Sequence, residues 1–222
     1  MGEHITLKAS DGFEPGAWRA DPAGAPRGAI VVIQEIMGVN HHIRAVADLY
    51  ASHGYLAIAP AIFDRAEPGF EAGYDGPSIQ RGMAIAGKLD RDKMLLDVAA
   101  AIERVKNAGK VGIVGYCLGG TVAYLAACRL SGLAAASCYY GGGVLALKGE
   151  SPRIPTILHF GSKDAHIPVA GVKEFEAAHP DLSVYLYDAD HGFNCDERGS
   201  YDAPSAALAR QRTLDFFKQK VG

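Results

Sequence analysis

Apolar runs long enough for β-strands alternate with stretches of helical periodicity along most of this chain. The run Ala29–Gln34 is apolar at nearly every position, which is typical of a parallel strand covered by helices on both faces. The expected strands are Ala29–Gln34, Leu56–Pro60, Val111–Gly115, Ala135–Tyr140, Thr156–Gly161 and Ser183–Tyr187. The expected helices are Ile43–Ser52, Arg91–Asn107, Leu118–Leu130, Val169–Ala178 and Ala206–Lys220. This alternation predicts an α/β fold with a mostly parallel central sheet flanked by helices on both faces.

Two segments depart from the alternation. Ile5–Ala9 and Gly16–Ala20 have the pattern of a β-hairpin ahead of the first parallel strand. Ile62–Gln80, rich in Gly, Pro and Asp, predicts a loop, which is either a lid or a surface loop without function. Because the 222 residues contain neither a linker nor a repeat, we expect a single domain over residues 1–222.

Charge and composition exclude several classes of partner. The net charge is −3 and the basic residues are scattered, so we expect no binding to nucleic acid or to an anionic membrane. No apolar run reaches the roughly 20 residues that span a bilayer. Met1–Thr6 lacks the basic start and apolar core of a signal peptide, so the four cysteines are expected to be thiols in the cytoplasm.

The segment Gly115-Tyr116-Cys117-Leu118-Gly119-Gly120 joins an expected strand to an expected helix. It has the Gly-x-nucleophile-x-Gly pattern of a nucleophile elbow, with Cys117 where serine is usual. The sharp turn brings neighbouring backbone close, so small residues are needed beside the nucleophile. The helix N-terminus favours a thiolate, which is the attacking form of cysteine. From this segment alone, a buried structural cysteine is an equal alternative.

An acid and a histidine follow Cys117 in the order of an α/β-hydrolase triad. Asp164 comes directly after the expected strand Thr156–Gly161, and His191 comes after Ser183–Tyr187. Parallel sheets place their sites at the carboxyl ends of strands. A nucleophile needs a base, and the base needs an orienting group. Cys117, Asp164 and His191 are therefore predicted to form a catalytic triad.

The other histidines have simpler interpretations. His166 is expected to be a loop residue, and His41 and His42 are expected to cap a helix or face solvent. Cys195 follows His191 by four positions, which without another cluster is weak support for a metal site. We therefore expect neither a metal nor a cofactor.

Glu35 stands at the carboxyl end of a buried strand, where a carboxylate is costly unless it has a partner or a role. On the residues alone, Glu35 is either a functional group beside Cys117 or an ordinary strand-end residue bonded to a loop. In this fold the backbone after that strand supplies half of an oxyanion hole. The N–H groups of Ile36 and Leu118 are therefore expected to form it.

Taken together, these segments resemble the dienelactone hydrolase family (carboxymethylenebutenolidases) of the α/β-hydrolases. The resemblance extends from about the first strand to the last helix. The matching segments are Gln34-Glu35-Ile36-Met37-Gly38, Gly115-Tyr116-Cys117-Leu118-Gly119-Gly120, Tyr139-Tyr140-Gly141, Gly161-Ser162-Lys163-Asp164, His191-Gly192-Phe193 and the closing Ala206–Phe217.

The resemblance implies a role for each catalytic residue. Cys117 is the nucleophile, His191 its partner and Asp164 the orienting acid. Glu35 is the extra carboxylate that holds the thiol in the resting enzyme and takes its proton when substrate binds. The implied reaction opens a carboxylated five-membered enol-lactone to a keto-diacid in the degradation of aromatic compounds.

The resemblance also implies arginines that bind the substrate carboxylate. Arg81 falls near one such position, whereas the other position, four residues after His191, is Cys195. Arg198 is a replacement for it or a solvated loop charge. Tyr139, in the matching Tyr-Tyr-Gly segment, completes the expected substrate-binding residues.

The expected function is hydrolysis of a small-molecule lactone or ester by a monomer or small homo-oligomer. One alternative is a carboxylesterase that acts on another small ester or lactone, since an arginine is missing. A second is a redox-sensing, non-catalytic relative in which Cys195 resolves an oxidised Cys117.

Overall fold

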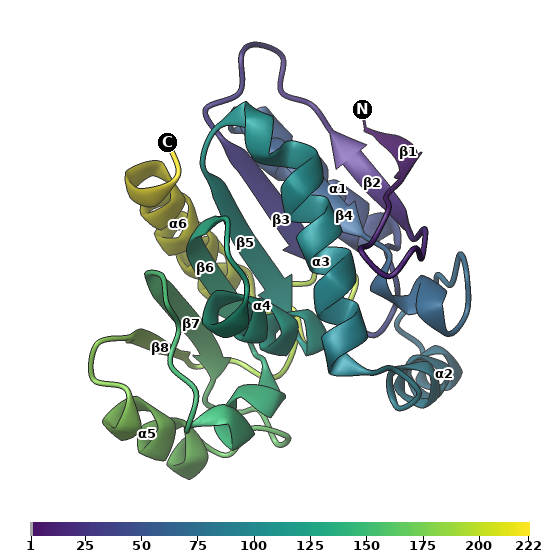
Figure 1. The fold of residues 1–222 in the computed structure, drawn as a ribbon. Coiled ribbons are helices and arrows are strands. Elements are labelled where there is room, and N and C mark those ends of the chain that lie inside the picture. Colours follow the sequence, from purple (N-terminus) through teal and green to yellow (C-terminus); the bar gives the residue numbers. More distant parts are fainter. Residues whose placement is uncertain (1) are drawn as a thin grey trace.

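The computed structural model describes residues 2–222 and contains one eight-stranded sheet, in the order β1-β2-β4-β3-β5-β6-β7-β8 (Figure 1). The strands are β1 (Glu3–Thr6), β2 (Gly16–Ala20), β3 (Ala29–Ile33), β4 (Leu56–Pro60), β5 (Val111–Tyr116), β6 (Leu133–Tyr139), β7 (Thr156–Gly161) and β8 (Ser183–Tyr187). β1 and β2 pair antiparallel, and β3 to β8 pair in parallel. The predicted α/β fold is confirmed. The extent of the domain, residues 1–222, stays a prediction.

Helices cover both faces of the sheet (Figure 1). They are α1 (His41–Ser52), α2 (Gly76–Ala86), α3 (Arg91–Val105), α4 (Leu118–Arg129), α5 (Val169–Ala178) and α6 (Ala203–Lys220). Short 3₁₀ turns span Ile62–Arg65, Lys106–Ala108 and Gly142–Leu147. α3 and α4 pack together on one face, and α1 and α6 lie on the other. All five residues of β3 are buried, as its unbroken apolar run predicts. Burying each large aliphatic side chain contributes about 1.5–3 kcal/mol to stability.

The first strand of the N-terminal hairpin, β1, begins and ends earlier than the predicted strand Ile5–Ala9. β1 ends at Thr6, but Leu7 N–H donates to Pro15 O and Ala9 N–H to Phe13 O, so irregular pairing continues. Leu7 and Ala9 are buried, which explains their apolar character without a regular strand.

The segment predicted to be a loop, Ile62–Gln80, contains helical structure at both ends. It opens with a 3₁₀ turn and runs into α2. The Asp75 side chain caps α2 by accepting the Ser78 N–H, and Pro77 stands in the first turn. A capping Asp with a Pro in the first turn of the helix is typical of a helix start. The same residue types also predict turns, and this ambiguity led to the wrong assignment.

Two helices also begin earlier than predicted, because a polar cap precedes each. Asn40 caps α1 and Asp202 caps α6. Among residues 2–222, no helix combines the length and the apolar character needed to cross a membrane.

Candidate active site

Cys117 occupies a strained turn between β5 and α4. Its φ is 54° and its ψ is −116°, a backbone conformation that costs a non-glycine residue about 1–3 kcal/mol. The residues two positions before and after Cys117 must be glycines because backbone lies against them. A Cβ on Gly119 would lie 2.4 Å from Ile33 O, and one on Gly115 would lie 1.9 Å from Gly119 O. The elbow thus presses β3, β5 and α4 together at the carboxyl ends of the strands.

His191 lies between Cys117 and Asp164 in one hydrogen-bonded row. Its Nδ1 is 2.6 Å from Asp164 Oδ2, and its Nε2 is 3.2 Å from Cys117 Sγ. The backbone N–H of His166 donates to the other carboxylate oxygen, Asp164 Oδ1, at 2.8 Å. Asp164 is buried, so each of its two oxygens has one fixed donor. This arrangement orients the imidazole, with its second nitrogen directed at the thiol.

The hydrogen bonds of this row also set the protonation states of His191 and Asp164. Burial by itself disfavours the imidazolium, but the hydrogen bonds to Asp164 and Cys117 outweigh it and raise the pKa of His191 to about 10. Burial alone would raise the pKa of Asp164, but the hydrogen bond and charge of His191 lower it below its ordinary value. A protonated His191 beside an ionised Asp164 is therefore the favoured state near neutral pH.

Ile36 and Leu118 line the same pocket as Cys117. Leu118 is the first residue of α4, where a helix leaves its N–H groups without partners. Among the hydrogen bonds of residues 2–222, neither N–H has an acceptor within the protein. Gly82 of α2 packs directly on the Ile36 backbone, because a Cβ there would lie 2.2 Å from Ile36 O. Both residues of the predicted oxyanion hole therefore lie in the wall of the pocket that contains Cys117.

Glu35 is fully buried and is bonded to residues other than the thiol. Tyr74 OH donates to its Oε2 at 2.9 Å, and Arg198 Nη1 lies 3.3 Å from its Oε1. The contact between Glu35 and the thiol that the resemblance implies is not among the hydrogen bonds of the described chain, in which Cys117 Sγ instead contacts His191. Arg198 also faces the Tyr74 ring, 5.7 Å from its centroid. It is thus an anchored pocket residue rather than a solvated loop charge.

The pocket at Cys117 has a volume of about 330 Å³ and mainly apolar walls. Its apolar side chains are Ile36, Ile79, Met83, Leu118 and Ile167, and its polar ones are Cys117, Thr121, His166, His191, Arg91 and Arg198. Arg91, the first residue of α3, was not predicted, because nothing in the sequence distinguishes it from an ordinary arginine at a helix start. The pocket therefore combines mainly apolar walls with two cationic side chains.

Two predicted substrate-binding residues lie elsewhere, and these predictions need correction. Arg81 forms an ion pair with Glu67 and is 64% exposed, outside the pocket that its neighbours Ile79 and Met83 line. Residues two positions apart on α2 face in nearly opposite directions. An uncertain alignment therefore cannot identify which of these side chains faces the pocket. Tyr139, in the interior strand β6, is buried against α6, where its hydroxyl lies 2.7 Å from Thr213 Oγ1.

The remaining histidines differ in their surroundings. His166 is a loop residue, as predicted, and its ring lies 5.8 Å from that of His191. His41 is exposed and pairs with Glu197. His42 is buried, contrary to prediction, because the helix cap is Asn40 and the second residue of α1 turns inward. All four cysteines are free thiols.

The chain is similar to known proteins in both its sequence and its fold. The profile of the dienelactone hydrolase family matches residues 16–221. A carboxymethylenebutenolidase from Pseudomonas putida is 35% identical over 97% of this chain and 96% of its own length. A Klebsiella pneumoniae structure, described as a candidate dienelactone hydrolase, has a TM-score of 0.86 and 29% identity, and the match covers 99% of both chains. An esterase structure from Pyrococcus furiosus shares the fold, with a TM-score of 0.74, 17% identity and 100% and 92% coverage.

Proposed function

The chain belongs to the dienelactone hydrolase family of carboxylic ester hydrolases, and we propose that it hydrolyses a small carboxylated lactone or ester through Cys117, His191 and Asp164. The observation that carries the proposal is the hydrogen-bonded row from Asp164 through His191 to Cys117 Sγ, at the wall of an apolar pocket. Nucleophile, base and orienting acid in hydrogen-bond contact are what acyl transfer requires.

Catalysis begins with attack of the Cys117 thiolate on the carbonyl carbon. The carbonyl oxygen becomes an oxyanion and accepts hydrogen bonds from the Leu118 and Ile36 N–H groups. When the tetrahedral intermediate collapses, the carbon–oxygen bond of the ester breaks and the enolate leaves. The His191 imidazolium transfers its proton to the leaving enolate and becomes neutral. An enolate is a good leaving group, which suits a thiolate nucleophile.

Water then hydrolyses the resulting thioester. Neutral His191 takes a proton from the water, the hydroxide attacks the thioester carbon, and the carbon–sulfur bond breaks. Cys117 and His191 return to their starting charges. Asp164 holds the imidazole tautomer in both steps and stabilises its charged form.

Glu35 and Arg198 are proposed to act together on the substrate. Arg198 pairs with Glu35 at 3.3 Å while lining the pocket. A substrate carboxylate that binds Arg198 displaces Glu35 from the guanidinium group. Glu35 can then accept the thiol proton of Cys117. Arg91, at the start of α3, supplies a second cation to the pocket. The two guanidinium groups favour a substrate with at least one carboxylate.

A second candidate is hydrolysis of a neutral small ester. Because Arg198 is already paired with Glu35, part of the positive charge of the pocket is neutralised. In this case Arg198 positions Glu35 and does not bind substrate.

The experiment that tests the proposal compares purified wild type with Cys117→Ala on cis- and trans-dienelactone and on p-nitrophenyl acetate. Turnover of a dienelactone by wild type alone supports the proposal. Turnover of p-nitrophenyl acetate alone favours the neutral-ester alternative. Turnover by Cys117→Ala near the wild-type rate contradicts the role of Cys117.

A further inference from the structure

Three buried side chains with metal-binding atoms meet behind the pocket. They are Glu35 at the end of β3, His42 in α1 and Cys195 in the loop after His191. One ligand atom from each lies within 4.8 Å of the others, and the exposed fractions of the three residues are 0%, 4% and 0%. A carboxylate, an imidazole and a thiol are rarely buried together without a reason.

The imidazole of His42 carries the strongest indication of a ligand. Its Nδ1 lies 3.3 Å from Asp196 Oδ1, whereas its Nε2 is buried without any hydrogen-bond partner. Asp196 is 72% exposed, so Nδ1 is directed toward the surface and Nε2 toward the interior. In metal centres, a ligating histidine typically binds a carboxylate through its other nitrogen, which orients the ring.

We propose that Glu35, His42 and Cys195 form a binding site for a thiophilic divalent cation of the Zn²⁺ type. One thiolate, one imidazole and one carboxylate are ligands that Zn²⁺ accepts, with a fourth position left for water. The ionised carboxylate and thiolate together supply two negative charges, which balance the charge of the cation.

To bind one cation, the ligand atoms of the three side chains have to move slightly closer together. Zn–N, Zn–O and Zn–S bonds of about 2.0–2.3 Å at tetrahedral angles place ligand atoms roughly 3.4–3.6 Å apart. The observed limit of 4.8 Å therefore has to contract by about 1 Å. Tyr74 OH can keep its bond to Glu35 Oε2 while Oε1 turns from Arg198 to the cation.

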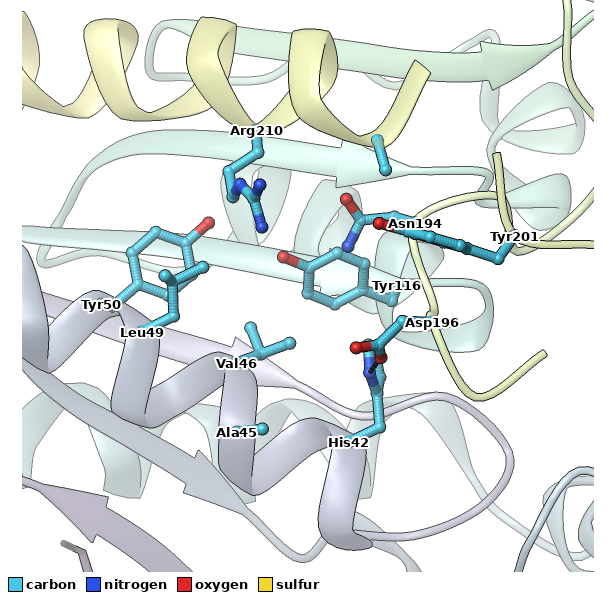
Figure 2. Close-up of a pocket in the computed structure, with 11 residues that line it drawn as sticks. His42, Ala45, Val46, Leu49, Tyr50, Tyr116, Asn194, Asp196, Tyr201 and Arg210 are labelled. Atoms are coloured by element: carbon cyan, nitrogen blue, oxygen red, sulfur yellow. Dashed lines mark hydrogen bonds and ion pairs between the residues drawn. The ribbon is translucent and has the colours of Figure 1, made fainter. Parts of the chain in front are cut away.

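A second cavity is lined by one of the three proposed ligand residues, His42. It has a volume of about 190 Å³ and lies between α1 and α6, away from the pocket at Cys117. Figure 2 shows His42, Asp196 and Tyr116 along this cavity, with His42 and Asp196 joined by their contact. The His42 imidazole therefore lies between this cavity and the buried Glu35 and Cys195.

Binding should release a proton. Cys195 is a free and fully buried cysteine in the described chain. Coordination replaces the S–H bond with an S–metal bond, and the proton goes to the buffer. Binding therefore strengthens as pH rises.

The consequence for activity rests on the proposed function, whereas the binding itself does not. A cation that holds Glu35 removes it from Arg198 and from the thiol of Cys117. Zn²⁺ is then an inhibitor that acts from behind the pocket, with Cys195 required for its effect.

The test titrates Co²⁺ into the Cys117→Ala protein, which lacks the one cysteine that is partly exposed and needs no hydrolysis. Our proposal predicts a near-ultraviolet sulfur-to-cobalt charge-transfer band that saturates at one equivalent and disappears in Cys117→Ala/Cys195→Ser. If that variant does not fold, Cys117→Ala/His42→Gln keeps every remaining thiol and should weaken binding at least about tenfold, or 1.4 kcal/mol. The proposal is overturned by absence of the band in Cys117→Ala, by its persistence in Cys117→Ala/Cys195→Ser, or by unchanged Co²⁺ affinity in Cys117→Ala/His42→Gln.

Calorimetry and kinetics give separate readouts. Zn²⁺ binding to Cys117→Ala, measured in two buffers of different ionisation enthalpy at pH 7, should release about one proton. In activity assays of proteins that retain Cys117, Zn²⁺ should inhibit the wild-type protein but not the Cys195→Ser variant. If Zn²⁺ binds as predicted and hydrolysis is unaffected, the role of Glu35 in catalysis is wrong while the metal site stands.

Discussion

His191 Nε2 lies 3.2 Å from Cys117 Sγ, although 74 positions separate the two residues in the chain. The contact joins the elbow after β5 to the loop after β8, at the same edge of the sheet. Because Asp164 holds the opposite ring nitrogen, the imidazole of His191 is kept in one orientation and one tautomer, with Nε2 facing the thiol.

Asp164→Asn should reduce kcat/KM by about 10²–10⁴-fold with little change in overall structure. The carboxylate is the first group that raises the pKa of His191 to about 10, so its loss should also move that pKa downward. The measurement is the pH dependence of kcat/KM beside a histidine titration by NMR. An unchanged His191 pKa would contradict the assigned pairing.

The same pair should make stability depend on pH in both directions. His191 has a higher pKa folded, about 10, than its ordinary value of 6.5. Its contribution is therefore complete below pH 6.5 and is lost as pH rises toward 10. Asp164 has a lowered pKa, so its contribution is present above its ordinary value of 3.8 and is lost at lower pH. Urea unfolding of wild type and His191→Gln should differ most near pH 6 and least above pH 10.

Glu35→Gln should lower kcat by about 10²-fold, because the amide cannot take the thiol proton and leaves Arg198 without its counter-charge. Tyr74→Phe is the matched control. It removes the hydrogen bond to Glu35 but keeps the carboxylate, so the loss should be smaller. Equal losses in the two variants would mean that Glu35 is only a structural acceptor. Steady-state kinetics in metal-free buffer separate the two results.

Arg198→Ala should raise KM for a carboxylated lactone by about 10–100-fold, the size of a lost charged hydrogen bond of 1.5–3 kcal/mol. Arg91→Ala should give a smaller increase, because that residue is exposed at the pocket mouth. Arg81→Ala is the control, since Arg81 lies outside the pocket and should change KM less than twofold. A large effect at Arg81 would restore the original assignment of the carboxylate site.

Gly119→Ala should destabilise the protein by about 3 kcal/mol or more, because the new methyl group would lie 2.4 Å from Ile33 O. Gly24→Ala adds the same methyl group with nothing within 4 Å. Its unfolding free energy should stay within about 0.5 kcal/mol of wild type. Chemical denaturation measures both. Similar values for the two variants would contradict the close packing of the elbow.

The residues predicted best from the sequence are those that a backbone geometry fixes. A buried strand ahead of Cys117 and glycines around it leave one conformation, and the strand ends after β7 and β8 set the positions of Asp164 and His191. Side chains on helices are less constrained. Arg81 and Met83 differ by two positions on α2, yet only Met83 faces the pocket.

Long-range contacts between polar side chains were not predictable either. Arg198 reaches Glu35 across 163 positions, and His42 meets Cys195 although neither has a recognisable ligand spacing. Such contacts depend on how the loop after β8 folds over α1. That loop has no periodic pattern from which its path could be derived.

The most direct test of the central claim is mass spectrometry of the protein quenched in acid during turnover of p-nitrophenyl acetate. Our account predicts one acetyl group per chain, attached to the peptide that contains Cys117 and absent in Cys117→Ala. Turnover at an unchanged rate with the acetyl group on another residue, or with none in any trapped sample, would contradict Cys117 as the nucleophile.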